Sequence, residues 1–124
     1  MSGKRLADYL DHMHQAASDA CAFVEGLVRE DFLEDKRTQQ AVIMSLLILG
    51  ESVTRIMDDH PGFAAAHATV PWSSMRGMRN RIAHGYFDIN LDVVWDTVEI
   101  NLPELLAQLE QVRSDARPDE NASV

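Results

Sequence analysis

The stretch that decides the fold reads Ala41-Val42-Ile43-Met44-Ser45-Leu46-Leu47-Ile48-Leu49. A helix turns by about 100° per residue, so these residues cover almost every side of a helix with apolar groups. A helix with one side in water carries polar residues on that side. The stretch therefore predicts a central helix, over about residues 37–57, against which the rest of the chain packs.

Three further helical segments flank the central one. Residues 6–27 have apolar side chains at spacings of three and four. Residues 71–85 begin with Pro, which suits a first helical turn, and end with Gly. Asn90 is a suitable cap for a last helix over about 90–109, and Pro103 should kink this helix or end its first half, because Pro lacks a backbone donor.

The remaining segments are expected to connect or extend these helices. Residues 29–36 are polar and acidic and should form a loop, and residues 58–70 a loop or a short irregular helix. Residues 114–124 are expected to be a disordered tail. No strand alternation or repeat is visible, so we predict one domain, 1–113, with an all-α fold: an antiparallel bundle of four main helices.

Composition fits a single soluble helical domain. The chain has 124 residues, of which 46% are hydrophobic, with only 4 Pro and 6 Gly. No apolar run is long enough to cross a bilayer, and the N-terminus lacks the apolar core of a signal peptide. The single cysteine, Cys21, excludes an internal disulfide, and its apolar neighbours favour buried packing. We therefore expect a cytoplasmic protein without a membrane anchor.

The charge of the chain is unevenly distributed. Its formal net charge of −9 argues against general, non-specific binding of nucleic acid. Residues 76–84 differ, because they contain Arg76, Arg79 and Arg81 and no acidic residue. Any contact with RNA should be narrow and confined to this basic segment.

Residues 79–86 combine four functional groups within two helical turns. Arg79 can clamp a phosphate and stays charged at any working pH. His84 can take or give a proton near neutrality, and Asn80 and Tyr86 add an amide and a phenol. This set suffices for metal-independent cleavage of a phosphodiester, without a cofactor. The structural alternative is that Arg and His complement the helix dipole before a Gly cap and that Tyr86 anchors the helix end.

Helical geometry separates the two main groups of this site. Arg79 and His84 lie about 140° apart on an ideal helix, whereas Arg76, Asn80 and His84 form one polar ridge. The opposing stripe is apolar and should face the core: Met75, Met78 and Ile82. A site forms either if Gly85 lets the helix end unwind or if two copies of the helix meet. We favour a homodimer, because a two-fold interface would place two Arg and two His in one groove.

The groups in that groove have distinct expected roles. His84 acts as general base on an RNA 2′-hydroxyl or as general acid to the leaving 5′-oxygen. Arg79 neutralises charge on the phosphoryl oxygens in the transition state, and Asn80 orients the imidazole or binds the phosphate. The expected products are a 2′,3′-cyclic phosphate and a 5′-hydroxyl.

Glu51 is a further supporting candidate. It follows Gly50 in the most apolar helix, where a carboxylate without a partner is costly. We expect it to form a salt bridge with Arg79 or Arg81 rather than to act directly in catalysis. Gly50 itself indicates a close crossing of two helices.

Other candidate side chains have ordinary structural interpretations. His12 and His14 lie on different sides of a helix and make a poor metal pair. His60 and His67 are expected in a solvated loop. The spacing of the two tryptophans is consistent with core packing: Trp72 and Trp95.

Several short motifs extend over roughly residues 6–110. They are Tyr9-Leu10-Asp11-His12-Met13, the segment 35–42, Leu49-Gly50-Glu51, Pro71-Trp72, Met78-Arg79-Asn80, His84-Gly85-Tyr86, Val94-Trp95 and Leu102-Pro103-Glu104-Leu105. In this combination the chain resembles the HepT-like toxins of the HEPN superfamily.

The resemblance implies a helical homodimer and a metal-independent ribonuclease whose Arg-x4-His-x-Tyr motif carries the activity. It also implies a partner, a minimal nucleotidyltransferase antitoxin of the MntA type, which can transfer AMP to the motif tyrosine and silence the toxin. By this resemblance Arg79 and His84 are catalytic, Asn80 is the polar residue after the arginine, and Tyr86 is the candidate site of AMPylation.

Two classes of function use the same residues. The first is a toxin that cleaves RNA and is restrained by the nucleotidyltransferase. The second is a non-catalytic HEPN-type binding module that docks a nucleotidyltransferase and binds nucleotides. Growth arrest and RNA degradation by the wild type, lost in Arg79→Ala and His84→Ala, would favour the first.

Overall fold

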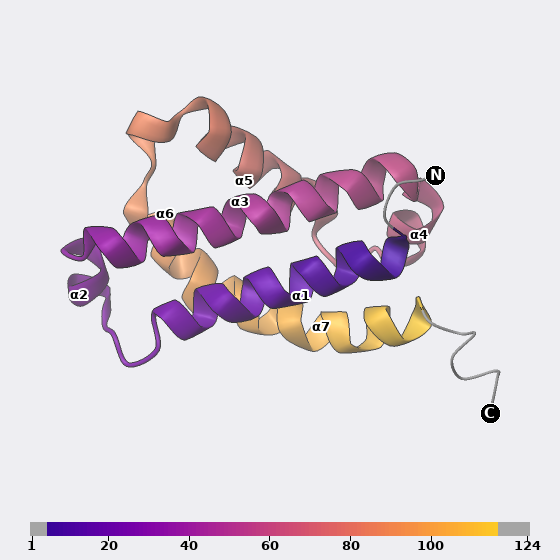
Figure 1. Ribbon diagram of the computed structural model, residues 1–124, viewed down its shortest axis with the longest axis horizontal. Helices are drawn as coiled ribbons and strands as arrows, with labels where there is room; N and C mark the ends of the chain where they lie inside the picture. The colour runs from indigo at the N-terminus through magenta and orange to yellow at the C-terminus, as the bar shows by residue number, and fades with distance from the viewer. Residues whose placement is uncertain (1–4, 117–124) are drawn as a thin grey trace.

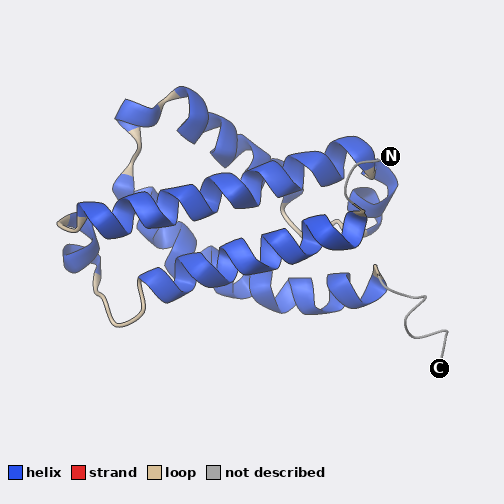
Figure 2. Cartoon of the chain, in the orientation of Figure 1, coloured by secondary structure: helices blue, strands red, loops and turns tan. Residues whose placement is uncertain are grey.

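The computed structural model describes residues 5–116, and every regular element in this part of the chain is helical (Figures 1 and 2). The elements are α1 (Leu6–Phe23), α2 (Arg29–Leu33), α3 (Lys36–Asp59), α4 (Pro61–Ala66), α5 (Trp72–His84), the 3-10 turn η1 (Tyr86–Asp88), α6 (Leu91–Asp96), the π-helical segment η2 (Thr97–Asn101) and α7 (Leu102–Asp115). Helix α1 packs antiparallel against α3 and α7, and α5 packs on α3 (Figure 1). The all-α prediction is confirmed.

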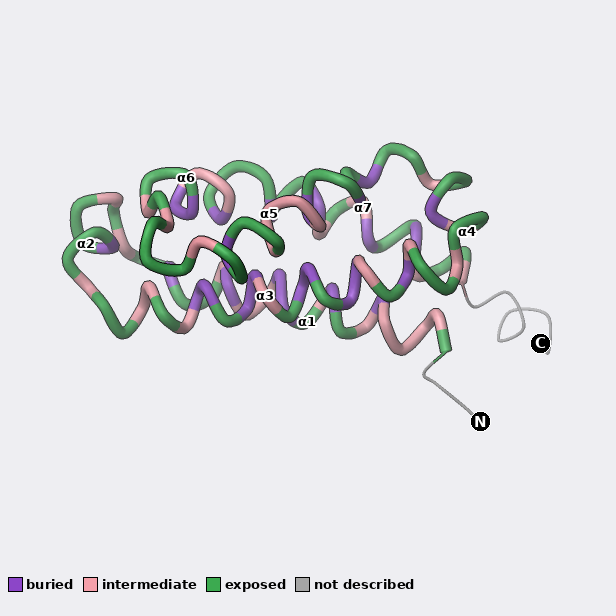
Figure 3. The backbone as a smooth tube through the Cα atoms, turned by 90° about the horizontal axis from the view of Figure 1, so that it is seen from above, coloured by how far each residue is buried: buried purple, intermediate pink, exposed green. Residues whose placement is uncertain are grey.

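Helix α3 supplies much of the core but is not enclosed on every side. Leu46, Leu49 and Val53 are fully buried, whereas Met44 is 57% and Ile48 46% exposed (Figure 3). The expectation of a wholly buried central helix is therefore wrong, because α1 and α5 flank an outward face of α3 that no other part of residues 5–116 covers. By length and composition α3 also meets the criteria for a membrane span, but half of its most apolar window is buried, as in the core helices of soluble proteins.

The segment 29–36, expected to be a loop, contains the short helix α2. Its Phe32 is fully buried and lies against Trp95, with ring centroids 5.5 Å apart. The Asp31 carboxylate accepts the Val28 N–H at 3.1 Å, and Arg29 pairs with acidic residues of α6. Two adjacent apolar side chains, Phe32 and Leu33, among charged ones give no periodic signal, so the sequence pattern did not reveal this helix.

The last helical region has the predicted cap and the predicted interruption. The Asn90 side chain accepts the N–H groups of Asp92 and Val93 at 3.0 and 3.2 Å. Before Pro103, which lacks a donor, the backbone widens into the π-helical segment η2. Helix α7 continues through Asp115, two residues into the expected tail, and residues 117–124 lie outside the described part.

His67 is held in place and is not the solvated loop residue that we expected. Its Nδ1 lies 3.0 Å from the Phe63 carbonyl oxygen and its Nε2 lies 3.1 Å from Asp115 Oδ2. The hydrogen bond with the Phe63 carbonyl raises the pKa of His67. The hydrogen bond between His67 and Asp115 lowers the pKa of the Asp115 carboxyl group. The imidazole thus fastens the end of α4 to the end of α7.

The packing expected for the tryptophans is confirmed, and that of Cys21 is only partial. Trp72 and Trp95 are buried, and the indole N–H of Trp72 donates to the His67 carbonyl oxygen at 3.1 Å. Cys21 is half-buried beside the Val98 carbonyl oxygen, and burial raises the pKa of its thiol. A thiol that stays protonated is a poor nucleophile, as its apolar neighbours indicated.

Candidate functional site

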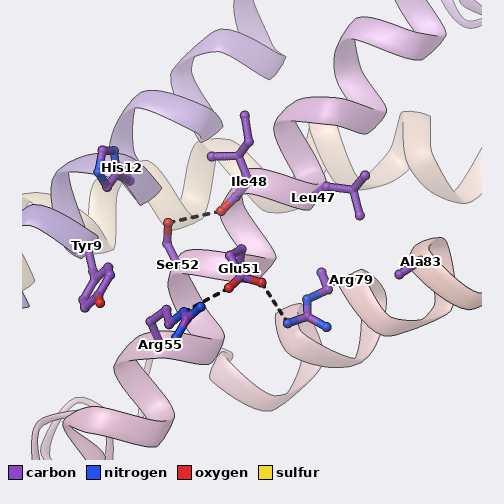
Figure 4. A pocket seen from close by; sticks show the side chains of 9 residues that line it. All are labelled: Tyr9, His12, Leu47, Ile48, Glu51, Ser52, Arg55, Arg79 and Ala83. Carbon is purple, nitrogen blue, oxygen red and sulfur yellow. Dashed lines mark hydrogen bonds and ion pairs between the residues drawn. The ribbon is translucent and has the colours of Figure 1, made fainter. Parts of the chain in front are cut away.

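Arg79 lies on α5, and its guanidinium is fixed by two neighbours, of which Figure 4 shows Glu51. Its Nη2 donates to Glu51 Oε1 at 3.0 Å, and its Nη1 donates to Asn80 Oδ1 at 2.8 Å. The side chain is 23% exposed, and its Nε is buried without a hydrogen-bond partner among residues 5–116. Of the two arginines expected to pair with Glu51, Arg79 is the partner. This arrangement holds a permanent cation at the surface in one orientation.

Glu51 is itself shared between two arginines. Its Oε2 accepts from Arg55 Nε at 3.0 Å, while Oε1 accepts from Arg79. About half of the Glu51 side chain is exposed, so the carboxylate is not the costly buried charge that the sequence suggested. Arg55 was missed at the sequence level, although its position one helical turn after Glu51 could have identified it.

The predicted close crossing of α3 and α5 is present at Gly50. A Cβ atom placed on Gly50 would lie 2.6 Å from Arg79 Cγ and nearer still to Arg79 Cβ. Any larger residue here would displace the stem of Arg79. Gly50 therefore sets how closely α5 approaches α3 and, with it, where the Arg79 guanidinium lies.

The Arg79 side chain lines a groove of about 850 Å³ that lies between α1, α3 and α5. Tyr9 and His12 lie on its α1 side, and Arg79 and Ala83 lie on its α5 side (Figure 4). The α3 residues between them are Leu47, Ile48, Glu51, Ser52 and Arg55. Sequence patterns placed none of the α1 residues here, because the groove joins three helices that are far apart in the chain.

His84 is the last residue of α5 and is exposed to solvent. The next amide, of Gly85, donates to the Arg81 carbonyl oxygen at 2.8 Å, which closes the helix. His84 therefore remains helical, and the helix does not unwind to swing it toward Arg79. One chain does not gather the two groups, since Arg79 lines the groove and His84 does not.

The polar ridge expected on α5 is divided in the structure. Arg76 pairs with Asp58 at 3.1 Å, at the end of α3, while Asn80 is turned toward Arg79. The opposing stripe faces the core as predicted, with Met75 and Ile82 buried and the third member partly buried: Met78. Within residues 5–116, no three His, Cys, Asp or Glu side chains are grouped to hold a metal ion.

Beyond His84 the chain presents aromatic side chains to solvent. Tyr86 is 51% exposed and Phe87 97% exposed, and the two rings meet edge to face with centroids 5.9 Å apart. The Tyr86 phenol is thus accessible, two residues after the imidazole. Together with Met44 and Ile48 of α3, these rings leave a considerable apolar area exposed on one chain.

Comparison with known proteins identifies relatives along almost the whole chain. The ribonuclease HepT-like family model matches residues 13–112. A candidate RNase of Methanocaldococcus jannaschii is 33% identical over 119 residues, which cover 96% of this chain and 93% of that protein. A protein of Thermococcus cleftensis named as a probable ribonuclease HepT is 38% identical over 106 residues, 86% of this chain and 94% of that protein.

A candidate RNase of Caldanaerobacter subterraneus subsp. tengcongensis is 34% identical over 104 residues, 84% of this chain and 90% of that protein. No solved structure matches the chain. The family match and each of these alignments cover most of the chain. The chain belongs to the ribonuclease HepT-like family.

Proposed function

We propose that this protein is a metal-independent endoribonuclease and the toxin of a toxin–antitoxin pair. One observation carries the proposal: α5 presents Arg79, fixed in an open groove, and ends five residues later in an exposed His84. A rigid cation that can bind a phosphate and a free imidazole that can move protons are the two groups that RNA cleavage needs. Membership of the ribonuclease HepT-like family supports the same conclusion.

The proposed reaction uses the 2′-hydroxyl of the RNA as its nucleophile. An imidazole of His84 removes the hydroxyl proton, and the 2′-oxygen forms a bond to phosphorus. Arg79 neutralises the charge that builds on the non-bridging oxygens. The bond to the 5′-oxygen breaks, and the protonated imidazole returns a proton to the leaving oxygen. The products are a 2′,3′-cyclic phosphate and a 5′-hydroxyl.

In the proposed site, Arg79 and His84 come from two copies of the chain. Exposed apolar side chains support a homodimer, since Met44 and Phe87 would otherwise remain in water. They lie on α3 and just after α5, the elements that carry Glu51 and Arg79. A two-fold axis across this face would bring Arg79 of one protomer toward His84 of its partner.

The proposed cleavage has a direct test. Wild-type protein incubated with single-stranded RNA and excess EDTA should release fragments that end in a 2′,3′-cyclic phosphate, identified by mass spectrometry. RNA carrying a single 2′-deoxynucleotide should resist cleavage at that position only, because the nucleophile is missing there. Cleavage at the deoxynucleotide would contradict the proposed chemistry. Intact RNA under all conditions would favour the non-catalytic binding module instead.

Tyr86 is the proposed point of control. Its phenol is 51% exposed and close in sequence to His84, so a nucleotidyltransferase antitoxin could reach it and add AMP. The added phosphate would place negative charge beside the RNA-binding face. Co-expression with an MntA-like nucleotidyltransferase should add the mass of one adenylyl group to the wild type but not to Tyr86→Phe. Modification of Tyr86→Phe to the same extent would exclude this site, with Tyr9 as the other tyrosine in the chain.

A further inference from the structure

The charged end of the groove contains a pair of arginines that share one carboxylate. The two oxygens of Glu51 each accept one guanidinium at 3.0 Å, Oε1 from Arg79 and Oε2 from Arg55. We infer that Arg55 is a second phosphate-binding residue, and that the groove beside it holds the nucleotide next to the scissile phosphate of single-stranded RNA. The inference rests on the proposed function and assigns a subsite to it.

The arrangement around Glu51 resembles the way two arginines hold a phosphodiester. A phosphodiester also offers two oxygens on one central atom, and a guanidinium binds either kind of anion with its planar fork of donors. The Arg55 side chain is 58% exposed and that of Glu51 51%. An ion pair exposed on both sides contributes little to stability, so an incoming phosphate can take the place of the carboxylate on Arg55 at small cost, while Arg79 keeps its bond to Glu51.

The walls of the groove suit a nucleoside. Tyr9 and His12 are three residues apart on α1 and therefore lie on one side of that helix. Their rings and the apolar floor of Leu47 and Ile48 can contact the faces of a base, while a phosphate meets the arginines at the rim. The groove has a volume of about 850 Å³, which accommodates the base and the ribose of one nucleotide.

Charge favours RNA over a protein segment as the occupant. The chain has a net charge of −9, yet this groove combines Arg55, Arg79 and an imidazole with a single carboxylate, Glu51. Nucleic acid gains affinity mainly by contacts of its phosphates with such cations. The apolar end of the same α3 face, at Met44, remains available for the second protomer.

The test measures binding separately from cleavage. A single-stranded RNA with 2′-O-methyl groups at every position cannot be cut by the proposed route, so its affinity can be titrated with active protein. Arg55→Gln should weaken binding about tenfold and lower the slope of log affinity against log salt by about one. Arg37→Gln, an exposed arginine earlier on the same helix, is the matched control and should leave both unchanged.

His12 provides a second variant that does not disturb the ion pairs. His12→Ala should weaken binding of the same oligonucleotide about fivefold or more, because a contact with a base is lost. His14→Ala is its control, since His14 lies two residues on and faces Glu110 of α7 at 3.6 Å. His12 is exposed, so its replacement should leave the melting temperature unchanged.

The possible outcomes separate this inference from the proposed function. If the wild type cleaves RNA but Arg55→Gln and His12→Ala bind as tightly as their controls, the subsite is overturned and the ribonuclease stands. If the wild type neither binds nor cleaves RNA, both fail. If either variant changes dimerisation in sedimentation experiments and not RNA affinity, a second protomer fills the groove and the subsite is again overturned.

Discussion

Replacing His84 by Ala should lower the rate of RNA cleavage by about 10²- to 10⁴-fold, the usual contribution of a positioned proton-transfer group. Arg79→Ala should cost about 10²- to 10³-fold, as expected when one group that stabilises transition-state charge is removed. His84 is exposed at the end of α5, so its loss should barely affect folding. Arg79→Ala also frees Glu51 and Asn80, but both of these side chains are already accessible to water.

Single-turnover rate constants, with excess protein over a labelled RNA, measure these losses without interference from product release. Thermal unfolding followed by circular dichroism shows whether each variant remains folded. Ser73→Ala, at the opposite end of α5, is the control and should match the wild type in both measurements. A His84→Ala protein with more than about a tenth of wild-type activity would remove His84 from the proposed mechanism.

Mixing the two inactive variants distinguishes a site within one chain from a site shared by two. If Arg79 of one protomer works with His84 of its partner, a mixed dimer contains one intact site and one that lacks both groups. Random pairing of equal amounts yields half mixed dimers, so about a quarter of wild-type activity should return. If each chain uses its own Arg79 and His84, no mixture can restore activity. Size-exclusion chromatography must first show that subunits exchange.

The fold was largely predictable because its main helices carry strong apolar periodicity. The cap at Asn90 and the interruption before Pro103 were also foreseeable, since each depends on the local chemistry of one residue. Helix α2 was not foreseeable, because it depends on the burial of Phe32 against Trp95, a contact between distant parts of the chain. His67 was misassigned for the same reason, since its partner Asp115 is 48 residues away.

The pairing of Glu51 with an arginine was predictable from the sequence, but the groove around this pair was not. The carboxylate next to Gly50 suggested a partner for an arginine, and the structure supplies Arg79. A sequence cannot indicate that α1 contributes Tyr9 and His12 to the same groove, because that depends on how α1 packs beside α3. It also cannot distinguish a helix buried by its own chain from one that leaves an apolar face, with Met44 and Ile48, to be covered by another molecule.

Gly50→Ala should destabilise the fold by about 1–3 kcal/mol, the usual effect of forcing one extra group into a close-packed contact. Glycine to alanine inside a helix ordinarily stabilises, by about 0.5–1 kcal/mol, because alanine loses less backbone entropy on folding. At Gly50 the sign should reverse, since the new Cβ would overlap the stem of Arg79. Urea denaturation compares the free energies of unfolding directly.

Gly77→Ala is the matched control, because Gly77 also lies inside a helix and its added Cβ meets only the flexible end of Arg81, at 3.3 Å. This variant should be as stable as the wild type or slightly more so. Only Gly50→Ala should also reduce cleavage, by up to about 10²-fold, since a shift of about 1 Å in α5 would carry the Arg79 guanidinium away from Glu51. If Gly50→Ala proved stabilising, like Gly77→Ala, the crossing would be looser than the structure indicates. Gly50 would then have no part in placing Arg79, and the position of the guanidinium would depend on its contacts with Glu51 and Asn80 alone.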